Sequence, residues 1–149
     1  MGDRLRIADF LSPLSKARLS ADQGYVEGQI GYVIETYETE MPDMDNASIV
    51  LVGCGETRGA DLSRTQTDAP DVIRRHFYQL FYWHNDIQIA DVGNVRIGHT
   101  LKDTYAALST VVRELIGAGK TVIILGGSQD LTLAQYRAYA ESEIGRAHV

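Results

Sequence analysis

The residues whose types and spacing could do chemistry run from Gly126 to Asp130, with the sequence GGSQD. They follow Thr121–Leu125, a continuous aliphatic and β-branched run of the kind that forms a parallel strand buried on both faces. The two glycines permit a sharp turn and the close approach of another group. Ser128, Gln129 and Asp130 then lie at the strand's carboxyl end, where ligands bind in open α/β sheets. The sequence therefore predicts a site at this loop.

Three apolar runs must position that loop. They cover residues 49–53, 87–91 and 121–125, and helical patterns separate them. Strands that alternate with helices in this way form a parallel sheet with right-handed crossovers. The sequence therefore predicts an α/β fold in which the three strands lie parallel in one sheet.

The helix between the first two strands is predicted to begin at Asp68 and to close with Trp83 and His84. Asp68 is its expected N-cap, because a proline and an acid follow in the first turn. The apolar residues at helical spacing are expected to form its buried stripe, namely Ile73, Phe77, Leu80 and Phe81.

The helix before the third strand has clear end signals. Thr100 with Asp103 predicts a capping box at its start, and Gly117 and Gly119 are expected to stop it. The first forty residues give weaker patterns. Residues 1–20 are predicted as a loop with one helical turn, and a helix face is predicted from Ile30 onward.

Composition and charge exclude several classes of protein. The net charge of −6 argues against a general nucleic-acid binder, which would carry a basic face. No run is long and apolar enough to span a bilayer, and the first ten residues do not resemble a signal peptide. Cys54 is the only cysteine, so an internal disulfide is impossible, and a reducing cytoplasm is the expected compartment. The thiol is interpreted as a packed rather than a reactive group.

The last residues, Glu143–Val149, read EIGRAHV, which resembles the translation of a sequencing adapter. On that interpretation they are a scar outside the fold, and the chain is the amino-terminal part of a longer protein. A genuine polar terminus is the alternative. The predicted organisation is an extension over residues 1–45, an α/β domain over 46–142 and the scar over 143–149. Deleting the scar is expected to leave the thermal midpoint unchanged.

Three pieces of the sequence together resemble the ureohydrolase family of arginase, agmatinase and formimidoylglutamase. They are VGCGETRGADL at the first strand, DAPDVIR at the start of the first helix, and LGGSQD after the third strand. The resemblance covers roughly residues 47–140 and implies a three-layer α/β/α fold whose mostly parallel sheet has the first strand between the other two. It also implies two manganese ions that hold a hydroxide, which attacks the carbon of a guanidinium or formimino group. The implied partners are a small amidine or guanidino substrate and further copies of the chain.

The family's metal ligands are a histidine after the double glycine, a D-x-H-x-D motif and a later D-x-D motif. The histidine position holds Gln129, a neutral and poorer ligand, and we find no D-x-H-x-D here. Gln129 therefore indicates a weakened metal site, a binding module that has lost the chemistry, or a hydrogen bond to backbone near the helix start. Asp130 is either a substitute carboxylate ligand or a capping acid. His76, His84 and His99 lack ligand spacing, so no histidine is assigned to metal.

The long loop after the first strand supplies the predicted substrate contacts. By resemblance it borders the crevice, where Arg58, near Glu56, could pair a substrate carboxylate. A solvated loop charge is the alternative for Arg58. Asp91, at the end of the second strand, is either a site carboxylate or a turn cap. Arg74 matches the family's helix arginine and is expected to pair with Asp71 or with a neighbouring carbonyl.

The first hypothesis is the amino-terminal part of a metal-dependent ureohydrolase, with formimidoylglutamase-like chemistry preferred. No catalytic residue is assigned within this chain, which is predicted to bind manganese only weakly and to leave the edge of its third strand uncovered. The rival hypothesis is a non-catalytic binding or assembly module with the same fold. A nucleotide binder that uses LGGSQD as a phosphate loop is disfavoured, because the motif is neither G-x-G-x-x-G nor a Walker loop.

Overall fold

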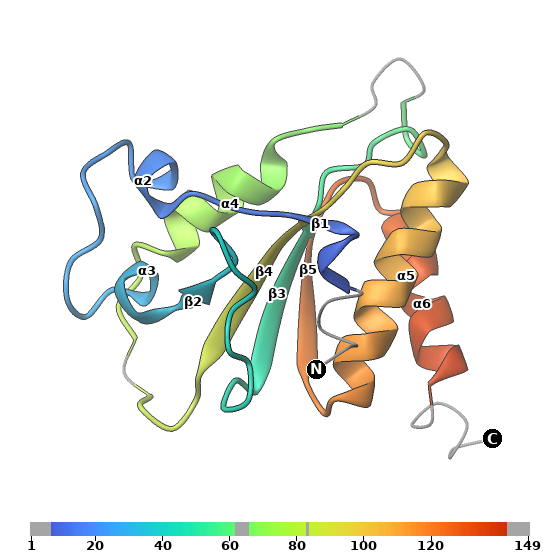
Figure 1. The fold of residues 1–149 in the computed structure, drawn as a ribbon. Helices are drawn as coiled ribbons and strands as arrows, with labels where there is room; N and C mark the ends of the chain where they lie inside the picture. Colours follow the sequence, from blue (N-terminus) through green and yellow to red (C-terminus); the bar gives the residue numbers. More distant parts are fainter. Residues whose placement is uncertain (1–6, 62–65, 83, 143–149) are drawn as a thin grey trace.

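Three long parallel strands form the centre of the molecule (Figure 1). The computed structural model describes residues 7–61, 66–82 and 84–142. β3 (Ile49–Cys54) lies between β4 (Ile89–Val95) and β5 (Thr121–Gly126), and both pairings are parallel. The prediction of one parallel sheet with the first strand in the middle is confirmed.

Two short strands extend the sheet beside β4. β1 (Leu11–Ser12) pairs with β4 in the antiparallel direction, and β2 (Glu35–Thr36) pairs with it in parallel. The sequence did not indicate β1, because two residues are too short for a period to show. On the opposite side, β5 ends the strand order of the described residues, as expected for this edge. The prediction that this strand is buried on both faces is wrong, because Ile123 is 44% exposed.

Helices cover both faces of the sheet, which gives the predicted three-layer α/β/α arrangement (Figure 1). α5 (Leu101–Gly117) and α6 (Leu131–Glu141) lie together on one face. α4 (Ala69–Phe77) lies on the other face, with the single helical turns α2 (Lys16–Leu19) and α3 (Ile30–Val33). Within the part of the chain that the structure describes, no helix combines the length and apolar character needed to cross a membrane.

The start of α5 is as predicted. The Thr100 hydroxyl accepts a hydrogen bond from the Asp103 amide at 3.1 Å, and the Asp103 carboxylate accepts one from the Thr100 amide at 3.0 Å. The helix ends at Gly117, two residues before Gly119, whose φ of +82° suits glycine. The capping box and the glycine stop are both confirmed.

α4 is shorter than predicted. It ends at Phe77 rather than at His84, and Trp83 lies outside the described residues. The carbonyls of Tyr78 and Leu80 accept hydrogen bonds at 2.8 Å from the amides of Gly31 and Ile30. The helix ends at Phe77 because the carbonyls that follow it bind amides of the amino-terminal segment instead of amides of a further helical turn. Asp68 occupies the N-cap position, but its side chain makes no capping hydrogen bond.

The predicted buried stripe of this helix is wrong except for Phe77, which is partly buried and packs against the buried cluster that contains Tyr78. Ile73, Leu80 and Phe81 are 41%, 56% and 67% exposed, whereas Arg74 and Tyr78 are fully buried. α4 directs the Arg74 side chain, rather than a row of aliphatic side chains, toward the sheet. It does so because the buried Asp91 carboxylate on β4 binds the guanidinium. Sequence periodicity cannot show this, since hydropathy counts arginine as a surface residue.

Arg74 and Asp91 form a buried ion pair that joins α4 to the sheet. Arg74 Nε and Nη2 donate to the two Asp91 carboxylate oxygens at 2.8 and 2.9 Å, and the Tyr78 hydroxyl donates to the same carboxylate at 2.7 Å. Arg74 also donates to Asp71 and to the Gly93 carbonyl, both at 3.0 Å, so its predicted structural pairing is confirmed. Asp91 accepts the Gly93 amide at 3.0 Å, the turn-cap alternative, but its main partner is the arginine.

β4 begins and ends later than predicted. The run 87–91 was expected, whereas the strand covers Ile89–Val95. Its pairing with β3 is irregular between Leu51 and Gly53, where Gly93 adopts a φ of +87°. A bulge of this kind lets the strand continue beyond a glycine that would otherwise indicate its end.

Candidate functional site

The loop after β5 is held against the loop after β3 at the carboxyl edge of the sheet. The Ser128 amide and hydroxyl both donate to the Glu56 carbonyl, at 3.0 and 3.2 Å. Gly127 has a φ of +78°, and a Cβ there would lie 2.5 Å from the Cys54 carbonyl oxygen and 2.6 Å from that of Glu56. Only glycine fits at this position, as expected for a loop that another segment approaches closely.

Glu56 is the buried centre of the candidate site. Its side chain is fully buried, and its carboxylate accepts hydrogen bonds from the amides of Thr57 and Arg58 at 3.0 and 2.9 Å. Arg58 adds Nε at 3.0 Å and Nη2 at 2.6 Å, which makes a bidentate ion pair. Two of the predicted site residues therefore bind each other.

Arg58 joins this pair to the loop that precedes α5. Its Nη1 donates to the His99 carbonyl and its Nη2 to the Gly98 carbonyl, each at 2.8 Å. The Thr104 hydroxyl accepts the Gly98 amide at 2.8 Å and lies 3.5 Å from Arg58 Nη2. The loops after β3, β4 and β5 are thus bound together through Glu56, Arg58 and Ser128.

The electrostatics follow from this network. Burial raises the pKa of the Glu56 carboxyl, but hydrogen bonds from Arg58 and Thr104 outweigh burial and hold the pKa below its usual value of 4.5. The hydrogen bond to Glu56 raises the pKa of Arg58 above its usual value. The pair is therefore charged over the neutral pH range.

Asp130 lies on the α5 side of the same edge. The Tyr105 hydroxyl donates a hydrogen bond to its carboxylate, and Gly59 lies so close to that carboxylate that a Cβ there would overlap it. The pKa of Tyr105 is raised to about 12, mainly by burial and to a smaller extent by the hydrogen bond with Asp130. The Asp130 side chain makes no capping hydrogen bond at the start of α6, so its described partner is a tyrosine.

Gln129 is not brought into this network. Its side chain is exposed, and its backbone carbonyl accepts the Thr132 amide at 3.0 Å in the first turn of α6. Across residues 7–61, 66–82 and 84–142, no group of three or more His, Cys, Asp or Glu side chains could hold a metal ion. Gln129 and Asp130 offer one neutral and one charged oxygen, too few for a tight first-row metal site. The described residues therefore do not fit a manganese centre by themselves.

Sequence reasoning missed Thr104, Tyr105 and the Gly98 turn. Thr104 lies at helical spacing between Leu101 and Leu108, so it was the one polar residue in a predicted apolar stripe, and it is fully buried. A polar side chain in such a stripe indicates a buried hydrogen-bond partner. Tyr105 gave no comparable signal.

The protein is an α/β/α domain whose polar loops gather at the carboxyl edge of a parallel sheet. The sequence model described as "Arginase family" matches residues 47–149, more than half of the chain. The chain belongs to the arginase family.

Known relatives agree with this assignment. The chain is 31% identical over 109 residues to a formimidoylglutamase from Staphylococcus epidermidis, a match that covers 68% of this chain and 35% of that protein. Solved structures give the same fold at lower identity. An arginase superfamily protein from Trypanosoma cruzi has a TM-score of 0.60 at 20% identity, covering 68% of this chain and 37% of that one. Formiminoglutamase from the same organism, in a structure with Mn²⁺, has a TM-score of 0.58 at 19% identity, covering 66% and 36%. The chain spans little more than a third of the length of these relatives.

Proposed function

We propose that this chain supplies the amino-terminal part of a metal-dependent hydrolase that cleaves the C–N bond of an amidine, formimino or guanidino group, with formimidoylglutamase-like chemistry preferred. One observation carries the proposal: hydrogen bonds of Glu56, Arg58 and Ser128 join the loops after β3, β4 and β5 at the carboxyl edge of the sheet. Membership of the arginase family and the relatives' names support it. The same proposal gives the protein a small-molecule substrate, a cytoplasmic location and a homo-oligomeric state.

Arg58 is the proposed substrate contact, with Glu56 as the residue that holds it. Arg58 donates from Nε and from Nη2 to the Glu56 carboxylate. The second Nη2–H binds the Gly98 carbonyl, and one Nη1–H binds the His99 carbonyl. A guanidinium has five N–H donors, so the contacts among the described residues leave one Nη1–H for a substrate oxygen. Because the side chain is 15% exposed, that donor reaches a ligand only at the surface, beside the carboxyl-edge loops.

Manganese, where it is bound, would polarise the substrate and activate water. From this chain, Gln129 and Asp130 are the proposed contributors to its coordination, and the remaining ligands must come from outside the described residues. Gln129→His alone is therefore not expected to create a working hydrolase in this chain.

Calorimetric titration of the 149-residue chain with manganese tests the proposed division of ligands. We expect only binding weaker than the micromolar range, since two oxygens are too few. Stoichiometric binding in the micromolar range or tighter would show that residues of this chain other than Gln129 and Asp130 form the metal site.

A non-catalytic binding module is the second candidate. The exposed neutral side chain of Gln129, where a metal ligand is proposed, favours it. The gene sequence beyond the codon for Ser142 separates the two candidates. Downstream D-x-H-x-D and D-x-D motifs, together with manganese-dependent cleavage of formiminoglutamate, agmatine or arginine by the encoded protein, would establish the enzyme. Absence of both motifs and of cleavage would establish the module.

A further inference from the structure

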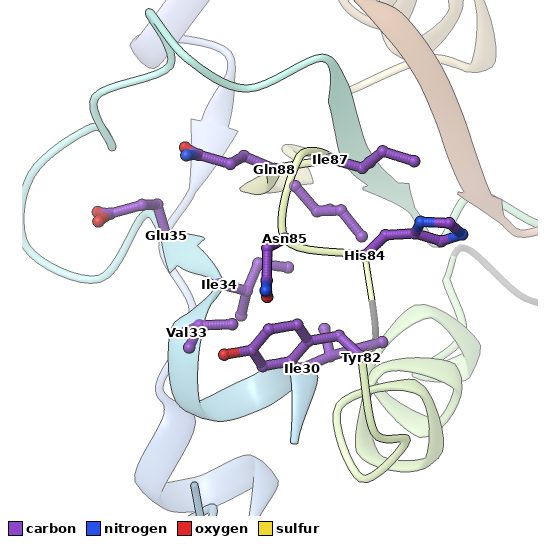
Figure 2. A pocket seen from close by; sticks show the side chains of 10 residues that line it. Ile30, Val33, Ile34, Glu35, Tyr82, His84, Asn85, Ile87 and Gln88 are labelled. Atoms are coloured by element: carbon purple, nitrogen blue, oxygen red, sulfur yellow. The ribbon is translucent and has the colours of Figure 1, made fainter. Parts of the chain in front are cut away.

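A second pocket lies at the amino-terminal end of β4, the opposite end of the sheet from the carboxyl-edge loops (Figure 2). Its cavity volume is about 320 Å³. That volume is at the lower end of the range for small-molecule sites, so the pocket suits a small ligand. One wall comes from α3 and the start of β2, and the other from the connection between α4 and β4.

Backbone hydrogen bonds hold the two walls together. The Ile30 amide donates to the Leu80 carbonyl at 2.8 Å, and the Tyr82 amide donates to the Gly28 carbonyl at 3.0 Å. β2 then pairs with β4 in a register that sets Glu35 beside Ala90. The pocket is therefore formed before any ligand arrives, which lowers the entropic cost of binding.

The floor is aliphatic and one side of the rim is acidic. Ile30 and Ile34 are 8% and 3% exposed, and the Tyr82 ring stands beside them (Figure 2). Of the described residues that line the pocket, Glu35 alone carries a carboxylate, and the amides of Asn85 and Gln88 lie along the same rim. A carboxylate beside an aliphatic floor complements a cation that carries a short apolar stem.

The surrounding charges favour the same ligand. Lys16 is the nearby cation: it donates to the Ile34 carbonyl at 2.8 Å and interacts with both Glu35 and Glu38. The two carboxylates exceed the one ammonium, and the whole chain carries −6. His84 lies 3.8 Å from the Asp86 carboxylate, which adds another negative group near the connection. This field attracts cations and repels anions.

We propose that this pocket binds a small alkylammonium or alkylguanidinium ion, with its charged head at Glu35 and its stem over Ile30 and Ile34. The residues of α3 and β2 precede residue 47, where the family match begins, so four of the ten lining residues lie outside the matched region. The pocket is separate from the carboxyl-edge site. The inference does not depend on the proposed hydrolase activity.

The test is an amide NMR titration of the 149-residue chain with butylguanidinium, with butyrate as the charge-reversed control. We expect saturable shifts at residues 30–35 and 82–89 with butylguanidinium, and weaker binding of butyrate. Because Glu35 is exposed, Glu35→Gln should weaken butylguanidinium by up to roughly fivefold. Glu40→Gln removes an equal charge from an exposed position outside the pocket and should leave the affinity unchanged.

Charge reversal gives a second and sharper comparison. Glu35→Lys should prefer butyrate to butylguanidinium, and its amide spectrum should otherwise match that of the unchanged chain, because the side chain is exposed. Three results would overturn the proposal: equal binding of the two probes by the unchanged chain, shifts confined to the loops around Glu56 and Gln129, or no saturable shift at tens of millimolar probe.

Discussion

Breaking the buried pair between Arg74 and Asp91 is expected to destabilise the protein severely. Both side chains are fully buried, and each Asp91 oxygen receives a guanidinium donor within 2.9 Å. Arg74→Met leaves the carboxylate with the Tyr78 hydroxyl and the Gly93 amide as its described donors. Asp91→Asn leaves a buried guanidinium beside a neutral amide. Removing one member of a buried ion pair costs about 3–5 kcal/mol.

That cost is large against the whole stability of a domain. Domains of this size unfold at a cost of about 5–15 kcal/mol, and each kcal/mol moves the thermal midpoint by roughly 2–4 °C. We therefore expect each single variant to lower the midpoint by roughly 6–20 °C. The double variant Arg74→Met, Asp91→Asn should lose less free energy of unfolding than the sum of the single variants, because neither charge is then left alone.

The chain offers a matched surface pair as the control. Arg113 donates to Glu141 at 2.7 Å, but these side chains are 41% and 55% exposed. Arg113→Met should cost no more than about 1 kcal/mol. Urea unfolding followed by circular dichroism measures all four variants. If Arg74→Met costs no more than Arg113→Met, or if the two buried changes add, the pair does not hold α4 to the sheet as argued.

Three further predictions use other parts of the structure. Gly127→Ala should cost more than about 2 kcal/mol in urea unfolding, because φ is +78° and the new Cβ would meet two carbonyl oxygens; Gly117→Ala, with open space around it and no positive φ, should be neutral or stabilising by up to about 1 kcal/mol. The Glu56 carboxyl has a lowered pKa in the fold, so its contribution to stability is complete above pH 4.5 and is lost as the pH falls below that value; the thermal midpoint of Glu56→Gln should therefore fall less steeply with acid than that of the unchanged chain, and equal slopes would contradict this. Cys54 is buried, and burial raises its thiol pKa to about 11, so a thiol reagent at pH 8 should label it only after unfolding, and rapid labelling of the folded chain would refute this interpretation.

The sheet could be predicted from the sequence because its evidence is local. β3 and β5 are continuous apolar runs, and the helix between the second and third strands carries both a capping box and a glycine stop. Such signals depend only on neighbouring residues, and the structure keeps them almost unchanged. The end of β4 was misplaced because Gly93 belongs to a bulge, which depends on the partner strand.

The contacts of the site could not be predicted, because they join residues far apart in the chain. Glu56 and Arg58 were chosen for their place in a long loop, but nothing local shows that Arg58 would reach the carbonyls of residues 98 and 99. The same limit explains the error in α4. Arg74 is buried because Asp91 lies opposite it on β4. The hydropathy pattern of the helix contains no information about that partner on another segment.

The binding of the loops to one another bears on the choice between the two proposed functions. Ser128 is fixed by the Glu56 carbonyl, and Glu56 is fixed by Arg58, so the position of the GGSQD loop does not depend on what occupies residue 129. The exposed Gln129 side chain adds nothing that the loop needs for its shape. A glutamine could therefore replace a metal ligand here without disturbing the fold, which allows the same scaffold to serve either a hydrolase with altered coordination or a binding module. The choice between the two therefore depends on the ligands supplied from outside the described residues.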